Sequence, residues 1–288
     1  MEVEGLSEFT SDSKIPYGLS TKSIRVDGLF ADFFYCVSAK PREALVLLGG
    51  SEGGKCWSDH TAQIQQFIEQ GYAVLSLAYF GLDPLPVHLQ AIPLEYFMRA
   101  FQWLASQPEI IPGRYTLLGV SRGAEAALLL GSICPQVKAV VAIAPSSVVF
   151  PGSPKNILDA LRGQHSAWSL RGHEIPYVPL PYSWTTLQGM ITGRRTHMFE
   201  QALLNAAAVE AAEIPVEMIR GPVLLESFTQ DQIWPSTLMA EQIVARLNAS
   251  EFRFYFKHNA HNTTHSNVPF EPCWTNILAF LKEYQGVS

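Results

Sequence analysis

Ser121 lies in the stretch with the clearest chemical potential, a G-V-S-R-G pattern at residues 119–123. An apolar run comes directly before this pattern, and a segment rich in Ala and Leu follows it. A strand before the pattern and a helix after it form a tight, strained turn that exposes the serine hydroxyl as a nucleophile. The amino end of the helix beneath that hydroxyl favours developing negative charge. We therefore predict a nucleophilic serine, with an ordinary strand–helix turn as the alternative.

A serine is a poor nucleophile unless a histidine accepts its proton and a carboxylate orients that histidine. On turns of this kind the partners follow in the chain order Ser, Asp or Glu, then His. Asp231 comes just after a predicted strand at 222–227, and the stretch KHNAHNTTH comes after a predicted strand at 252–256. Glu226 is the alternative acid, but it falls within the first of these strands. The order therefore predicts a triad of Ser121, Asp231 and a histidine.

Three histidines compete for the role of base. His258 follows the predicted strand too closely, and His265 lies deeper in the loop. His261, preceded by the small Ala260, stands where the loop can swing its imidazole onto the serine, so we predict His261 as the base. Taken singly, the acid and the histidine could be a helix cap and a surface loop residue, but their joint order favours a triad.

The negative charge on an attacked carbonyl oxygen needs two backbone donors. One is expected at Arg122, the residue after the nucleophile. The other is expected from a glycine-rich loop at residues 49–54, GGSEGG, where the amide of Ser51 is our prediction and Glu52 is the runner-up. Glu52 is also a predicted substrate-binding residue. The loop lacks the G-K-[ST] ending of a phosphate-binding loop, which disfavours that interpretation.

The elements that must position these residues can be predicted from six short apolar runs, which alternate with segments of helical period. Runs that are apolar throughout are typical of parallel strands covered on both faces. Strand–helix alternation predicts an α/β fold with a mostly parallel, doubly wound sheet. Ahead of these runs, a D-G pair at residues 27–28 predicts a hairpin. The six runs lie at 44–48, 73–79, 115–119, 137–144, 222–227 and 252–256.

The chain of 288 residues is predicted to form one domain with an insertion. Residues 1–22 are expected to be a flexible arm, and residues 23–288 the domain. About 77 residues separate the fourth and fifth apolar runs, far more than a plain crossover needs. We predict that residues 151–220 form a cap over the carboxyl ends of the strands, where α/β sheets bind ligands. A decorated crossover without a role is the alternative.

The charge and composition of the chain limit which binding partners and which cellular compartment we expect. The net charge of −6 and the isoelectric point of about 5.8 disfavour nucleic-acid binding, which requires a clustered basic surface. No apolar run is long enough to span a bilayer, and the acidic start lacks the pattern of a signal peptide. Four scattered cysteines fit neither a disulfide scaffold nor a zinc site. We expect a cytoplasmic protein without cofactor, metal, nucleic acid or membrane span.

Taken together, these motifs resemble the C-terminal catalytic domain of acyl-CoA thioesterases and bile acid-CoA:amino acid N-acyltransferases, a family with the α/β-hydrolase fold. The resemblance covers roughly residues 40–285. The family's nucleophile, acid and base map onto Ser121, Asp231 and His261. The markers are the segments LLGGSEGG, GYAVLSLAYFG, IPLEYFMRAFQWLASQPEI, LLGVSRGAE and IPVEMIRGPVLLESFTQDQIW, and the Ala260–His261 step.

Three departures from the family pattern bear on function. Mammalian members carry an N-terminal β-sandwich domain, whereas about 40 residues precede the matching region here. The acyltransferases use cysteine where this chain has Ser121, and a serine favours attack by water over conjugation to an amino acid. Residues 151–220 match only in patches, such as SLRGHEIPYVP, so the family's acyl-group selectivity does not transfer.

The predicted cap is rich in aromatic residues and arginines. Aromatic walls hold an acyl chain by burial, so we predict Trp168 and Trp184 as substrate-binding residues. Arginines pair with phosphates or acidic surfaces, and we predict Arg194 and Arg195 for that role. The alternative is that the aromatic residues only pack the cap and the arginines are solvated.

The resemblance implies a serine hydrolase that cleaves a small-molecule acyl thioester, carried by coenzyme A or by an acyl carrier protein, through an acyl-enzyme intermediate. A carboxylesterase or dienelactone-hydrolase-like enzyme acting on oxygen esters is the alternative. A non-catalytic binding protein with this fold is a third interpretation, which the intact triad disfavours.

Overall fold

The computed structural model describes residues 19–37, 40–153, 163–181, 195–265 and 271–285. At their centre is an eight-stranded sheet with the strand order β1-β2-β4-β3-β6-β7-β10-β11. β2 is antiparallel to both β1 and β4, and the neighbours from β4 to β11 are parallel. The strands of this sheet span Leu19–Val26 (β1), Leu29–Cys36 (β2), Arg42–Leu48 (β3), Ala73–Ala78 (β4), Ile110–Val120 (β6), Val137–Ile143 (β7), Val223–Phe228 (β10) and Phe256–His261 (β11).

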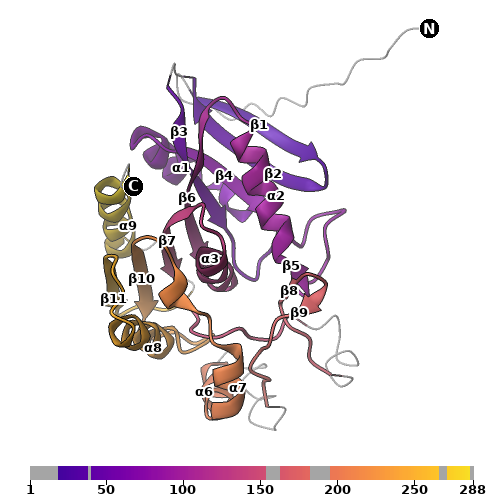
Figure 1. Cartoon of the computed structure of the whole chain (residues 1–288), viewed down its shortest axis with the longest axis vertical. Helices are drawn as coiled ribbons and strands as arrows, with labels where there is room; N and C mark the ends of the chain where they lie inside the picture. Colours follow the sequence, from indigo (N-terminus) through magenta and orange to yellow (C-terminus); the bar gives the residue numbers. More distant parts are fainter. Residues whose placement is uncertain (1–18, 38–39, 154–162, 182–194, 266–270, 286–288) are drawn as a thin grey trace, which may run out of the picture.

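Helices cover both faces of the sheet, which confirms the predicted doubly wound α/β fold (Figure 1). Helices α2, α3 and α8 pack in one core cluster, and α1 and α9 in another. Ala44 and Val46 of β3 belong to the first cluster, and Leu45 and Leu47 to the second. Burial on both faces explains why this run shows no polar alternation. The helices span Thr61–Glu69 (α1), Leu94–Ala105 (α2), Arg122–Ile133 (α3), Thr196–Leu203 (α6), Ala206–Ala212 (α7), Ser236–Ala249 (α8) and Glu271–Tyr284 (α9), with short 3-10 turns at Cys56–Asp59 and Val216–Met218.

Five of the six predicted strands overlap β3, β4, β6, β7 and β10. The sixth, expected at residues 252–256, is wrong in position, because β11 begins where that run ends. Pairing with β10 sets its register: Val223 pairs with Phe256, and Phe228 pairs with His261. The aromatic Phe252 packs against the core from outside the strand. Much of the histidine-rich stretch therefore lies in the sheet and not in the loop after it.

The chain enters the sheet at Leu19, inside the segment predicted as an arm at residues 1–22; residues 1–18 lie outside the described residues. The predicted hairpin is present, with Val26 paired to Leu29. Asp27 and Gly28 both have positive φ angles, of 51° and 75°. A two-residue turn of this hand matches the natural twist of the two strands it joins.

The insertion predicted at residues 151–220 is described in part. It contains α6, α7 and two short strands, β8 (Trp168–Leu170) and β9 (His173–Glu174), which form a three-stranded sheet with β5 (Ile92–Pro93). In Figure 1 α6 and α7 lie at the lower end of the molecule, and β8 and β9 lie above them at the right, next to β5. A third apolar cluster fastens α6 and α7 to the domain, where Phe150 and Trp234 pack with Ala202 of α6 and Ala212 of α7. Trp168 of β8 packs in the first cluster.

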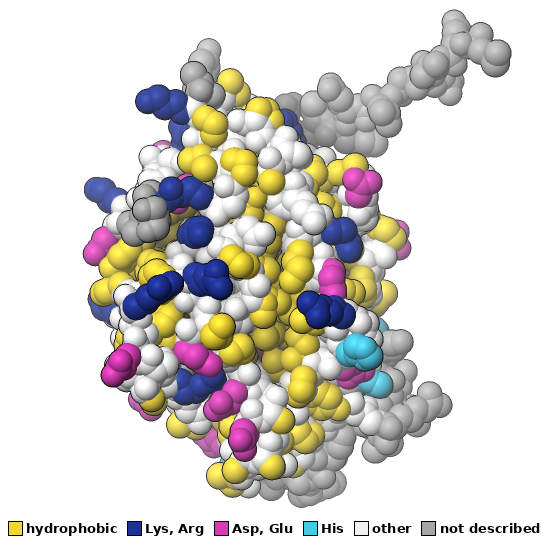
Figure 2. Space-filling view, viewed as in Figure 1, with side chains coloured by type: hydrophobic (Ala, Val, Ile, Leu, Met, Phe, Trp, Pro, Cys, Tyr) yellow, Lys and Arg dark blue, Asp and Glu magenta, His cyan; other side chains and the backbone are white. Residues whose placement is uncertain are grey.

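On the surface shown in Figure 2, Lys and Arg side chains are interspersed with Asp and Glu, and hydrophobic side chains lie between them. None of the helices in the described ranges has the length and apolar character needed to cross a membrane.

Candidate active site

Ser121 stands on the turn between β6 and α3. Its φ and ψ are 55° and −116°, a strained conformation for a residue with a side chain. The surrounding backbone holds it there: the Ser121 amide donates to Ile143 O (2.8 Å), and its carbonyl accepts from the amides of Ala124 (2.9 Å) and Glu125 (3.1 Å). This is the strand–turn–helix geometry that the G-x-S-x-G pattern predicts.

Two glycines allow the turn to close. A Cβ on Gly119 would collide with the carbonyl of Gly123, and a Cβ on Gly123 would collide with the carbonyls of Leu48 and Gly49. Close approach of β6, α3 and the end of β3 therefore requires glycine at both positions. The same packing places the oxyanion loop, residues 49–54, beside the start of α3.

Gly50 is the residue of this predicted oxyanion loop that lies against Ser121. A Cβ on Gly50 would be 3.2 Å from the Ser121 Cβ and 3.3 Å from Val120 O. Its amide donates to Oε1 of Glu52 (2.8 Å), while Ser51 and Glu52 are exposed. Sequence reasoning chose Ser51 and did not consider Gly50, which the glycine pair at residues 49–50, directly after β3, could have indicated.

The helix side of the site supplies further donors, because the first amides of an α-helix have no acceptor within the helix. The amide of Arg122, predicted as an oxyanion donor, opens α3 directly after Ser121. We therefore keep Arg122 as one donor and add Gly50 to Ser51 as a candidate for the other.

The Arg122 side chain turns into the protein. Its guanidinium pairs with Glu125 (2.7 Å) and donates to the carbonyls of Phe150 (3.2 Å) and Pro151 (2.6 Å). Trp168 Nε1 donates to the second oxygen of Glu125 (2.6 Å). Burial raises the pKa of Glu125 to about 7, and Arg122 opposes that rise. This network ties α3 to the start of the insertion and to β8.

Breaking this network should destabilise the protein in a pH-dependent way. In Arg122→Met, Glu125 loses its cation while remaining buried, so its pKa rises further above the unfolded value. Stability is then retained at low pH and lost as the pH rises through the folded-state pKa. We expect a loss of about 3–5 kcal/mol at about pH 8 and a smaller loss at about pH 5.5, measured by denaturant unfolding.

The double variant Arg122→Met with Glu125→Gln is the control for this prediction. The glutamine is neutral and still offers an oxygen to Trp168. It should recover part of the lost stability at the higher pH and remove the pH dependence. An equal loss at both pH values in the single variant would contradict a role for the Glu125 charge.

Trp168, predicted to bind substrate, is completely buried. Its ring packs with Tyr79 and Phe97, at centroid distances of 5.8 and 6.0 Å. Arg195 is exposed at the start of α6, and its amide donates to Gln232 O (2.7 Å). Trp184 and Arg194 lie outside the described residues.

The carboxylate of Asp231 accepts four hydrogen bonds within the described part of the chain. Oδ1 accepts from the amides of Ile233 (2.9 Å) and Trp234 (3.2 Å). Oδ2 accepts from Ser236 Oγ (2.7 Å) and from Nδ1 of His265 (2.8 Å). The side chains of Asp231 and His265 are 2% and 13% exposed, respectively. A histidine held through Nδ1 has the tautomer whose Nε2 accepts a proton from a serine.

A second carboxylate–histidine pair lies beside the first. His261 bonds through Nε2 to Oε2 of Glu226, which is fully buried and also accepts from Asn259 (2.7 Å) and Asn276 (3.5 Å). Burial raises the pKa of Glu226, and the bond to His261 opposes the rise. Among the described residues, Cys273 places its sulfur within 4.8 Å of the ligand atoms of this pair. Burial and the Glu226 charge raise the pKa of its thiol.

The structure thus brings Asp231 together with His265, and the predicted base His261 together with Glu226. The position of β11 explains the pairing. His258 and His261 lie within the strand three residues apart, so their side chains leave opposite faces of the sheet. His258 bonds to Ser227 Oγ (2.7 Å), and burial lowers its pKa. His265 follows in the loop beyond β11.

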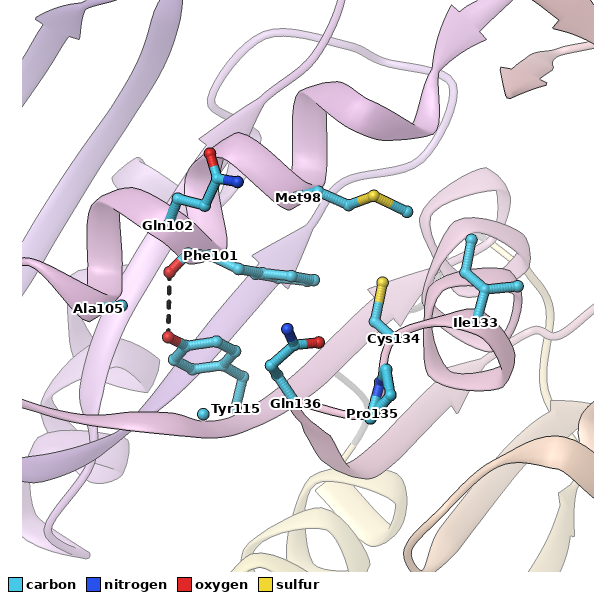
Figure 3. Close-up of a pocket in the computed structure, with 10 residues that line it drawn as sticks. Met98, Phe101, Gln102, Ala105, Tyr115, Ile133, Cys134, Pro135 and Gln136 are labelled. Atoms are coloured by element: carbon cyan, nitrogen blue, oxygen red, sulfur yellow. Dashed lines mark hydrogen bonds between the residues drawn. The ribbon is translucent and has the colours of Figure 1, made fainter. Parts of the chain in front are cut away.

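Two cavities differ in where they lie relative to Ser121. The cavity in Figure 3, of about 370 Å³, has Tyr115 and Cys134 in its wall and lies between α2, the start of β6 and the end of α3. Ser121 follows the other end of β6, so this cavity is remote from it. A wider cavity of about 640 Å³ includes His88 and His165. Part of its wall comes from the loop after β4, at the edge of the sheet where Ser121 lies. This loop contacts residues 49–54 through the Gly54 amide, which donates to Phe80 O (2.8 Å).

Sequence comparisons match this chain to one family. The family described as "BAAT / Acyl-CoA thioester hydrolase C terminal" matches residues 92–285. Acyl-coenzyme A thioesterase 1 of Homo sapiens is 30% identical over 238 residues, which are 82% of this chain and 51% of that protein. Acyl-coenzyme A amino acid N-acyltransferase 2 of Rattus norvegicus is 26% identical over 271 residues, 91% of this chain and 59% of that protein. The chain therefore spans about half the length of these relatives.

Solved structures show the same fold at low sequence identity. A puromycin-hydrolysing peptidase of Mycobacterium tuberculosis has a TM-score of 0.63 and 16% identity, covering 93% of this chain and 40% of that one. An esterase of Pyrococcus furiosus has a TM-score of 0.60 and 15% identity, covering 93% and 94%. These neighbours are similar to the chain in fold and confirm its α/β-hydrolase architecture.

Proposed function

Because the chain belongs to the BAAT / acyl-CoA thioester hydrolase C-terminal family, as its motifs predicted, we propose that it hydrolyses an acyl thioester with Ser121 as the nucleophile. The relatives' names and the hydrolase fold support an ester or thioester hydrolase. The single observation that carries the proposal of a serine enzyme is the strained turn at Ser121, with Gly50 beside it.

The mechanism follows from the groups at the carboxyl ends of the strands. Asp231 holds Nδ1 of His265, and Nε2 of this histidine takes the proton of Ser121 as the serine attacks the thioester carbonyl. The thiol leaves with that proton, and the same histidine then activates the water that hydrolyses the acyl-enzyme. His261, the base favoured by the sequence, remains the competing assignment, with Glu226 as its acid.

The negative charge on the tetrahedral intermediate is stabilised by amides at the turn. We propose the amide of Arg122 as one donor and an amide of the oxyanion loop as the other, from Ser51 or from Gly50, whose N–H donates to Glu52 in this structure. A serine at this position favours attack of water on the acyl-enzyme. The acyltransferases that the chain resembles use cysteine at the same position. Hydrolysis is therefore favoured over amino-acid conjugation.

Coenzyme A is the thiol carrier named in the relatives, and an acyl carrier protein is the other carrier that we predict. The cavity of about 640 Å³ shares the catalytic edge and is a candidate site for part of the substrate. Thr196 Oγ1, at the start of α6, donates to Asp231 O (2.8 Å) and so connects α6 to the segment that carries the proposed acid. This bond supports placing the neighbouring Arg195 close to the site.

Comparison of carriers for one acyl group tests the function. The purified chain is assayed with an acyl-CoA, the same acyl group on an acyl carrier protein, and its p-nitrophenyl ester, with Ser121→Ala as the blank. We expect kcat/KM for a thioester to exceed that for the oxygen ester by about tenfold or more. A higher kcat/KM on the oxygen ester would favour the carboxylesterase alternative. Absence of turnover on all three, with no labelling of Ser121, would favour a binding protein.

A further inference from the structure

Glu52 places a negative charge beside the nucleophile, and we propose that it selects against acyl groups that carry a carboxylate close to the thioester carbonyl. The inference rests on the proposed function and names the acyl class that the site takes. Neutral acyl groups are accepted, and short dicarboxylic acyl groups are disfavoured.

The position of the Glu52 carboxylate follows from Gly50. Its Oε1 accepts the Gly50 amide at 2.8 Å. A Cβ built on Gly50 would be 2.8 Å from Oε2 of Glu52 and 3.2 Å from the Cβ of Ser121. The carboxylate of Glu52 and the side chain of Ser121 thus flank the same point beside Gly50, so an acyl group attached to Ser121 comes close to the carboxylate.

Lys55, three residues after Glu52, and Arg122, directly after Ser121, each pair with another carboxylate. Lys55 pairs with Asp32 (2.5 Å), and Arg122 pairs with Glu125 (2.7 Å). Within the described part of the chain, no salt bridge includes Glu52. Its charge reaches its neighbours: burial and then Glu52 raise the pKa values of the Cys56 thiol and the Tyr79 hydroxyl.

Like charges near a protein surface repel over several ångströms, with a strength that depends on solvent screening. Glu52 is exposed, so the repulsion is weaker than between buried charges. We therefore expect discrimination of about tenfold between matched neutral and anionic acyl groups, and we expect high salt to reduce it.

The test uses Glu52→Gln, which keeps an oxygen for the Gly50 amide and removes only the charge. Inactivation rates are measured for two fluorophosphonates that differ by a methyl or a carboxylate near the phosphorus, with labelling at Ser121 checked by mass spectrometry. Turnover of butyryl-CoA and succinyl-CoA, which share a four-carbon acyl chain, gives the same ratio for substrates. Glu52→Gln should raise the anionic-to-neutral ratio about tenfold at low salt and less at high salt.

Glu69→Gln is the matched control, because Glu69 is an exposed glutamate at the far end of α1. It should leave the ratio unchanged. If Ser121 is labelled but Glu52→Gln does not change the ratio, the selectivity proposal fails while the serine hydrolase stands. If neither probe labels Ser121, both the proposed function and this inference fail.

Discussion

Ser121→Ala is expected to abolish turnover, with kcat lowered by at least about a thousandfold. The substitution removes the hydroxyl that we propose forms the acyl-enzyme and leaves the proposed oxyanion donors in place. The strained backbone at this position is held by Ile143, Ala124 and Glu125 through main-chain bonds, so the fold should be retained. Release of thiol from a thioester substrate measures the loss of turnover, and circular dichroism checks that the fold is retained.

Ser51→Ala is the matched control for this variant. It deletes an exposed hydroxyl in the oxyanion loop and leaves the backbone amide that could act as a donor. Activity should stay close to that of the unmodified chain. A fluorophosphonate should label the unmodified protein at Ser121, and labelling of a different serine would overturn the assignment of the nucleophile.

His265→Ala is expected to lower kcat/KM by several orders of magnitude, because it removes the imidazole that Asp231 holds through Nδ1. His261→Ala should lower activity far less and lower stability more. It leaves Glu226 fully buried without its histidine, and an uncompensated buried carboxylate costs about 3 kcal/mol or more at a pH where it is ionised.

The two variants are compared by kcat/KM and by thermal unfolding, with His258→Ala as a third histidine that should retain activity. The stability loss in His261→Ala should shrink at low pH, because protonation of Glu226 removes the buried charge. An inactive His261→Ala with unchanged stability, beside an active His265→Ala, would return the role of base to His261.

Much of this protein could be predicted from the residues alone. The strand–serine–helix pattern around Ser121 depends on local geometry, because glycines at 119 and 123 permit one kind of turn. The apolar runs predicted five strands because parallel strands buried on both faces leave a strong local signal. The family was also accessible, since its motifs are continuous segments of sequence.

The pairing of acids with histidines was decided by the tertiary structure. Whether His261 lies in a loop or in a strand depends on the register between β10 and β11, which is a long-range property. The aromatic residues before β11 have high strand propensity, but packing placed them outside the paired segment. Because β11 begins a few residues later than predicted, His261 lies in the sheet, where it bonds to Glu226. His265 lies in the loop after the strand, where it bonds to Asp231.

Two further features depended on distances between segments far apart in the chain. An aromatic residue in an insertion, such as Trp168, predicts the wall of a binding pocket. In the structure, contacts with Tyr79, Phe97 and Glu125 bury Trp168 in the core. Gly50 touches the nucleophile because the end of β3 packs on the start of α3. Local sequence determines which turns and strands can form, whereas close packing of distant elements determines which side chains meet.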